Sequence, residues 1–172
     1  MKSNIELWGW EKKPRTMLRY IKIGDIVCFE TDHTGKSFGY GQLIAQLETG
    51  GFVFKAMNII HQSPNDITVE EIVHSDTLGK PCVLDVYSTL DRKKHINNGE
   101  WRIIGRENDF KIKEEDLNTI YFIYGIGKGF WKKINLLNEV TPISDEEAEK
   151  YLDAGLNTGD QVKIWYVQYD SP

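Results

Sequence analysis

Residues 23–29 read Ile23-Gly24-Asp25-Ile26-Val27-Cys28-Phe29, a tight Gly-Asp turn that leads into a strand of apolar and β-branched residues. Two more strand patterns follow, at residues 37–45 and 52–57, and glycine-rich segments separate them. Gly39 and Gly41 lie inside the second pattern, where glycine is typical of a bulge or a bend. The three patterns predict a curled antiparallel sheet that forms part of a partly open small barrel.

Turn and helix signals extend this prediction to a mainly β, α+β fold with two short helices. Glu48-Thr49-Gly50-Gly51 predicts a hairpin turn, and Thr68-Val69-Glu70-Glu71 predicts a capped helix that ends near Ser75. Ser144-Asp145-Glu146-Glu147 predicts a second capped helix, which Gly155 would end. We expect the other strands at residues 82–87, 101–105, 120–124, 130–137 and 162–167. Because no linker-like composition interrupts the chain, we expect one domain over residues 1–172.

The composition is that of a globular protein, with 172 residues of which 40% are hydrophobic and 12% aromatic. The formal net charge of -5 disfavours a nucleic-acid partner and permits a basic protein as partner. The start of the chain is too polar for a signal peptide, and no apolar run is long enough to span a membrane, so we expect a cytoplasmic protein. Cys28 and Cys82 lie in apolar strand patterns, which predicts buried, reduced thiols.

The residues that could carry chemistry form no catalytic pattern. The four histidines have no metal-ligand spacing, and Asp32-His33 in a turn is more typical of a solvated pair than of an acid–base site. Gly125-Ile126-Gly127-Lys128-Gly129 is not followed by the Ser or Thr of a phosphate-binding loop, so it favours a hairpin turn. We therefore expect no enzyme activity, no metal and no cofactor.

Two alternatives stay open at the level of sequence. Tyr40, Trp101 and Trp131 could form an aromatic platform, which would make the chain a small-barrel module that binds a ligand or nucleic acid. A hydrolase could use Asp32 and His33 if folding brought a cysteine or serine beside them.

Four segments resemble the immunity protein 26 family of bacterial polymorphic-toxin systems. They are residues 23–29, Phe38-Gly39-Tyr40-Gly41-Gln42-Leu43-Ile44, Gly79-Lys80-Pro81 and Gly99-Glu100-Trp101-Arg102-Ile103-Ile104-Gly105. The resemblance rests on their order and spacing and covers residues 18–110. The chain departs from the family pattern at Gln42, where a basic residue often follows Gly-Tyr-Gly, and it continues in a β-rich extension over residues 111–172.

The resemblance implies a protein that binds a cognate toxin domain and neutralises it by occlusion, without catalysis. We expect the partner-binding residues on two segments, the loop at residues 31–36 and the acidic helix start at residues 145–149. The candidates are Asp32, His33, Lys36, Asp145, Glu146 and Glu149. Gly24, Asp25, Gly39, Gly41 and Gly105 are expected to serve the fold, through turns and bulges. The sequence carries no signal for an oligomeric state.

Overall fold

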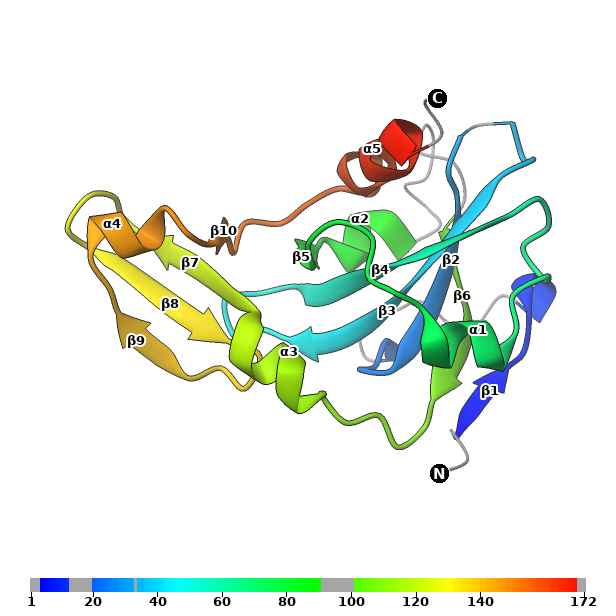
Figure 1. Ribbon diagram of the computed structural model, residues 1–172, viewed down its shortest axis with the longest axis horizontal. Coiled ribbons are helices and arrows are strands. Elements are labelled where there is room, and N and C mark those ends of the chain that lie inside the picture. Colours follow the sequence, from blue (N-terminus) through cyan, green and yellow to red (C-terminus); the bar gives the residue numbers. More distant parts are fainter. Residues whose placement is uncertain (1–3, 13–19, 33, 91–100, 170–172) are drawn as a thin grey trace.

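The computed structural model describes residues 4–12, 20–32, 34–90 and 101–169, and its strands form two sheets (Figure 1). The larger sheet is antiparallel throughout, in the order β1-β6-β2-β3-β4-β5. Its strands are β1 (Ile5–Leu7), β2 (Asp25–Glu30), β3 (Phe38–Gln46), β4 (Phe52–His61), β5 (Cys82–Leu84) and β6 (Trp101–Glu107). The predicted mainly β, α+β class is confirmed, and the larger sheet is open rather than closed into a barrel.

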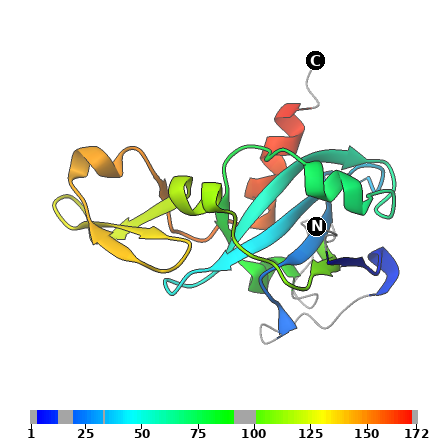
Figure 2. The ribbon, with the colours of Figure 1, turned by 60° about the horizontal axis from the view of Figure 1, so that its bottom comes forward.

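The smaller sheet has four strands in the order β10-β7-β8-β9. They are β7 (Tyr121–Gly125), β8 (Trp131–Asn135), β9 (Val140–Pro142) and β10 (Leu152–Asp153). The pairs β7–β8 and β8–β9 are antiparallel, and β10 runs parallel to β7. The predicted hairpin turn at residues 125–129 connects β7 to β8. Figures 1 and 2 show that the two sheets occupy opposite ends of the long axis of the molecule.

The helices are short, and two of them have the predicted N-caps. They are η1 (Trp10–Lys12), α1 (Val69–His74), α2 (Val86–Leu90), α3 (Glu114–Thr119), α4 (Asp145–Ala148) and α5 (Gly159–Tyr169). Before α1, Thr68 and Glu71 form the complete capping box. Before α4, Ser144 accepts from the Glu147 amide, but the Glu147 carboxylate accepts from Lys133 instead of closing the box. No helix in the described part of the chain is long and apolar enough to cross a bilayer.

The prediction of a strand at residues 162–167 is wrong, because this segment lies inside helix α5. Strand alternation would place residues 162 and 164 on one face and residue 163 on the other. In the structure Val162 and Lys163 are both buried while Ile164 is exposed. A short apolar run is compatible with the two-residue period of a strand and with the 3.6-residue period of a helix. Here the chain forms a helix, and its Val162 packs into the core.

Three smaller predictions also need correction. The strand expected at residues 82–87 stops at Leu84 and is followed by α2, whose Val86 and Leu90 pack into the core. The second capped helix ends at Ala148 rather than at Gly155, and the chain then forms β10. Helix α3 was not predicted, since it has no side-chain cap and begins at Glu114 after a charged segment.

Both faces of the larger sheet are covered. On one face, Phe29, Phe54 and Trp101 pack together, and the rings of Phe29 and Trp101 stack at 4.0 Å between centroids. Helices α2 and α5 add Val86, Leu90 and Val162 to this cluster. The opposite face carries a second cluster, to which η1 and α1 contribute: Trp10, Ile26, Cys28, Phe38, Tyr40, Met57, Ile67, Ile72 and Ile104. Two buried faces explain why β2 and β3 are apolar almost throughout.

Glycines in the larger sheet make room for its aromatic core. A Cβ atom at Gly41 would lie 2.1 Å from Cζ of Phe54, so only glycine allows the Phe54 ring to lie across β3. The pairing of β3 with β4 shifts register between Gly39 and Tyr40, which is the bulge expected from the sequence.

The smaller sheet is joined to the larger one by a third apolar cluster and by Asn138. The cluster combines residues of β3, β4 and β5 with residues of the smaller sheet: Ile44, Ala45, Leu47, Val53, Val83, Ile120, Phe122, Ile134, Leu136 and Ala154. Asn138 has a φ of 63° in the turn between β8 and β9. Its side chain donates to the Gln46 carbonyl at 3.0 Å and accepts from the Glu48 amide at 2.8 Å.

Gly24 and Gly50 allow a test of the Gly-Asp turn, because both have φ near +95° but differ in surroundings. A Cβ atom at Gly24 would lie 2.5 Å from the Glu107 carbonyl oxygen, whereas nothing lies within 4 Å of one at Gly50. We expect Gly50→Ala to lower the free energy of unfolding by about 1–2 kcal/mol through backbone strain alone. Gly24→Ala should lower it by about 1–3 kcal/mol more, because the clash adds to the strain. Urea denaturation measures both, and equal losses would contradict the role given to Gly24.

Candidate functional site

Among the described residues, the cysteines and the one paired histidine have structural surroundings, and no metal-binding group is found. Burial raises the pKa of the Cys28 thiol and raises that of Cys82 to about 12, so both cysteines are protonated and enclosed in the core. His61 lies 3.0 Å from the Glu71 carboxylate, which also accepts from the Thr68 amide, so this pair connects β4 to the start of α1. Within the described ranges no three His, Cys, Asp or Glu side chains converge as metal ligands would.

The predicted loop at residues 31–36 lies at the end of β2, in the larger sheet. Asp32 is exposed, and its carboxylate accepts from the amide and the hydroxyl of Thr34, which stabilises the turn itself. Lys36 is exposed, and His33 lies outside the described residues. Buried Lys163 of α5 has its pKa lowered by burial, and the charges of Asp160, Glu30 and Asp32 oppose this change. The loop therefore lies beside α5.

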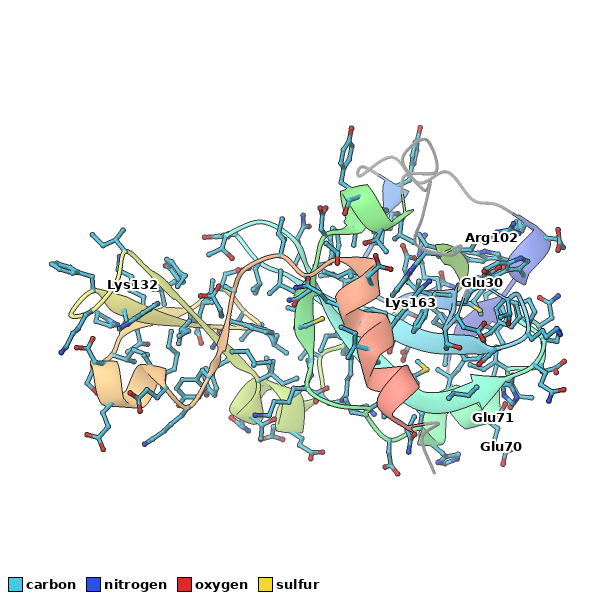
Figure 3. All side chains as sticks on the ribbon, turned by 90° about the horizontal axis from the view of Figure 1, so that it is seen from above. Glu30, Glu70, Glu71, Arg102, Lys132 and Lys163 are labelled. Atoms are coloured by element: carbon cyan, nitrogen blue, oxygen red, sulfur yellow. The ribbon has the colours of Figure 1, made fainter. Side chains whose placement is uncertain are left out.

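The predicted acidic segment lies on α4, at the outer end of the smaller sheet. Glu146 and Glu149 are exposed, whereas Asp145 is half-buried and accepts from the Gly129 amide at 2.6 Å. This bond ties α4 to the turn between β7 and β8. The two predicted segments are not brought together, because the loop and α4 lie at opposite ends of the long axis (Figure 1). Figure 3 shows the same separation between Lys132 of β8 and Glu30 of β2.

Lys133 holds α4 against the smaller sheet. Its ammonium group donates to the Glu147 carboxylate at 2.9 Å and lies 4.8 Å from the ring centroid of Tyr121 and 5.3 Å from that of Tyr151. The hydrogen bond raises the pKa of Lys133 and lowers that of Glu147. Glu146 of α4 and Glu149 at its C-cap are exposed to solvent.

A groove of about 830 Å³ lies on the other side of the smaller sheet. Cross-strand pairing places Tyr124, Lys132 and Pro142 side by side on its floor, on the face that continues into the junction with the larger sheet. The β3–β4 turn contributes Thr49, and β10 and the residues after it contribute Asp153, Ala154 and Gly155. Ile126, Gly129, Phe130, Trp131 and Ile143 complete the lining.

The tip of the β7–β8 hairpin exposes two large apolar side chains at the mouth of this groove. Ile126 is 89% exposed and Phe130 is 65% exposed. Leu137 and Val140 are exposed as well, but they lie at the other end of β8 and β9, away from this tip. Adjacent exposed apolar side chains with charged neighbours are typical of a protein-binding surface, whereas scattered ones are ordinary.

This groove is not evident from the sequence. Residues 125–129 form the predicted hairpin turn, but the sequence pattern assigns no role to Ile126, Phe130 or Lys132. The available signal was the pair of apolar residues in and next to a glycine-rich turn, where polar residues are the usual choice. The lining itself comes from four separate segments, and their meeting could not be read from spacing.

The aromatic platform considered from the sequence does not form. Tyr40 and Trp101 are fully buried and belong to clusters on opposite faces of the larger sheet. Trp131 belongs to β8 of the smaller sheet, at the other end of the long axis from the larger sheet (Figure 1). No stacking surface for bases is built from these three residues.

Comparison with known proteins identifies the family. The family model described as Immunity protein 26 matches residues 22–132, and the chain belongs to this family. The match reaches beyond the segments that carried the resemblance and ends in β8. No curated protein and no solved structure matches the chain.

The contact between Lys133 and Glu147 predicts a pH dependence. Because the hydrogen bond from Lys133 lowers the pKa of Glu147, its stabilising effect is present above the ordinary glutamate pKa and is lost as the pH falls through the lower folded value. In Lys133→Met we expect the pKa of Glu147 to rise toward its ordinary value, which an NMR titration of the side-chain carboxyl carbon measures. Lys132→Met is the matched control, since Lys132 lies on the opposite face of β8. An unchanged Glu147 pKa in Lys133→Met would contradict this assignment.

Proposed function

We propose that this member of the immunity protein 26 family binds a cognate bacterial toxin domain in the cytoplasm and neutralises it by covering its working surface. Family membership supports the general role. The observation that carries the choice of surface is the exposure of Ile126 and Phe130 beside the groove of the smaller sheet. No catalytic step is part of the proposal.

The outer end of the smaller sheet has the composition of a binding surface. Ile126 and Phe130 supply apolar anchors of the kind that carry most of the energy in protein interfaces. Glu146 and Glu149 supply an exposed acidic rim, which would speed association with a basic toxin surface and favour it over acidic partners. Lys133, Tyr121 and Tyr151 hold this rim in place, so little ordering is needed on binding.

The size of a typical inhibitory interface favours binding at one end of the molecule over an interface that includes both predicted segments. An inhibitory interface of standard size covers about 800 Å² of each partner, out of 10023 Å² of accessible surface here. The loop between β2 and β3, which contains Asp32 and Lys36, lies at the far end of the long axis from α4 (Figure 1). We therefore propose the α4 end as the toxin-binding surface and assign no toxin contact to the loop at residues 31–36.

Ligand binding is the second candidate function, since a groove of about 830 Å³ has the size of a small-molecule site. The two candidate functions differ in one measurable respect. If the groove binds a small ligand instead of the toxin, substitutions around the groove should leave the affinity for the toxin domain unchanged.

Co-expression with the toxin domain encoded beside the gene of this chain tests the proposal. We expect cells to survive and a stable 1:1 complex to copurify. Death of cells that contain both proteins in soluble form would refute the pairing.

Charge reversal tests the choice of surface. The double variant Glu146→Lys/Glu149→Lys should slow association by about 10-fold at low salt, measured by surface plasmon resonance, because electrostatic steering is reversed. The matched control is Glu114→Lys/Glu115→Lys, which makes the same charge change in the first turn of another short helix, α3. Lys36→Glu should bind as the wild type does. A loss in Lys36→Glu with none in the α4 variant would move the interface to the other end.

A further inference from the structure

One positively charged side chain lines the groove, that of Lys132. Lys132 lies on its floor between Tyr124 and Pro142. None of the ion pairs found among the described residues involves Lys132, whereas its neighbour Lys133, on the opposite face of β8, is paired with Glu147. Lys132 is exposed, and the groove that it lines is otherwise mainly apolar (Figure 3 labels Lys132).

Asp153, the one acidic residue in the groove lining, does not neutralise the charge of Lys132. Asp153 accepts from the Gly155 amide at 2.6 Å, which stabilises the turn after β10, and it makes no ion pair with Lys132. The groove therefore presents one positive charge next to the apolar side chains of Ile126, Phe130, Pro142 and Ile143. A ligand complementary to this groove would carry a negatively charged group next to an apolar group.

The edges of the smaller sheet make strand addition a poor means of binding. The Ile143 amide donates to the Trp131 carbonyl and the Asn135 amide to the Glu139 carbonyl, so the antiparallel alternation turns the backbone groups of Val140 and Pro142 toward the outer edge of β9. Pro142 has no amide hydrogen to donate there, and β10 at the other edge has only two residues. A partner would thus be recognised by side chains in the groove rather than by backbone pairing.

We propose that the groove receives from the toxin domain a loop in which an apolar side chain stands next to a carboxylate. The apolar side chain packs against Ile126 and Phe130, and the carboxylate accepts from the ammonium group of Lys132. This inference rests on the proposed function and adds the chemistry of the anchoring segment. It also gives Lys132 a role opposite in charge to that of the acidic rim on α4.

Two lysines of the same hairpin provide a matched test. Lys132→Met removes the groove cation, and Lys128→Met removes a cation from the hairpin turn outside the groove lining. With a catalytically inactive form of the toxin domain encoded beside the gene, we expect Lys132→Met to raise Kd by at least about 10-fold and Lys128→Met by no more than about 3-fold. Phe130→Ala should also raise Kd by at least about 10-fold. Thermal unfolding should be unchanged in all three, because the altered side chains are exposed.

Salt dependence gives a second readout. The Kd of the wild type and of Lys128→Met should rise with ionic strength more steeply than that of Lys132→Met, which has lost one of the attractive charge pairs.

The outcomes separate this inference from the proposed function. If the wild type binds the toxin and neither Lys132→Met nor Phe130→Ala weakens binding, the groove inference is overturned while the immunity function stands. If the wild type does not bind the toxin, both are overturned. Dimerisation of the wild type that Phe130→Ala abolishes would make a second copy of the chain the occupant and would overturn the inference as well.

Discussion

The buried ion pair between Asp25 and Arg106 is the contact on which the larger sheet depends. Asp25 is fully buried, accepts from the Lys22 amide at 2.8 Å and pairs with the Arg106 guanidinium group. Burial raises the pKa of Asp25, while the bonds from Arg106 and Lys22 oppose that rise. A buried charge left without its partner costs about 3–5 kcal/mol. The pair therefore holds β2 against β6 at the point where their register shifts, between Ile26 and Val27.

The position of the smaller sheet follows from a different set of contacts. Lys55 of β4 and buried Asp116 of α3 form an ion pair at 2.8 Å, and Asn138 bonds the β8–β9 turn to the β3–β4 hairpin. Together with the apolar junction, these contacts connect the inner part of the smaller sheet to the larger one. Helix α4 covers one face of the outer part, and the groove lies on the other face, where the junction ends. The site is thus a consequence of how the two sheets meet.

The parts of this fold that local chemistry determines were predictable from the sequence. The Gly-Asp turn, the bulge at Gly39 and the caps at Thr68 and Ser144 depend on neighbouring residues, and the structure has them where the sequence placed them. Helix α5 depends instead on a distant surface, because its Gly159 lies against the indole of Trp101, where a Cβ atom would be 2.8 Å from Nε1. The separation of Asp32 from Glu146 likewise follows from the relative placement of two sheets, which no local pattern records.

The hairpin between β7 and β8 shows how residues without a role in the fold point to an interface. Its glycines are explained by the turn, where Gly127 and Gly129 have φ of 124° and 83°. Ile126 and Phe130 are explained by neither the turn nor the core, since polar residues form such turns equally well and both side chains remain in solvent. Exposed apolar area contributes nothing to folding and gains free energy only when another surface covers it. The contact with a toxin domain that we propose would cover both side chains, whereas the fold alone leaves them in solvent.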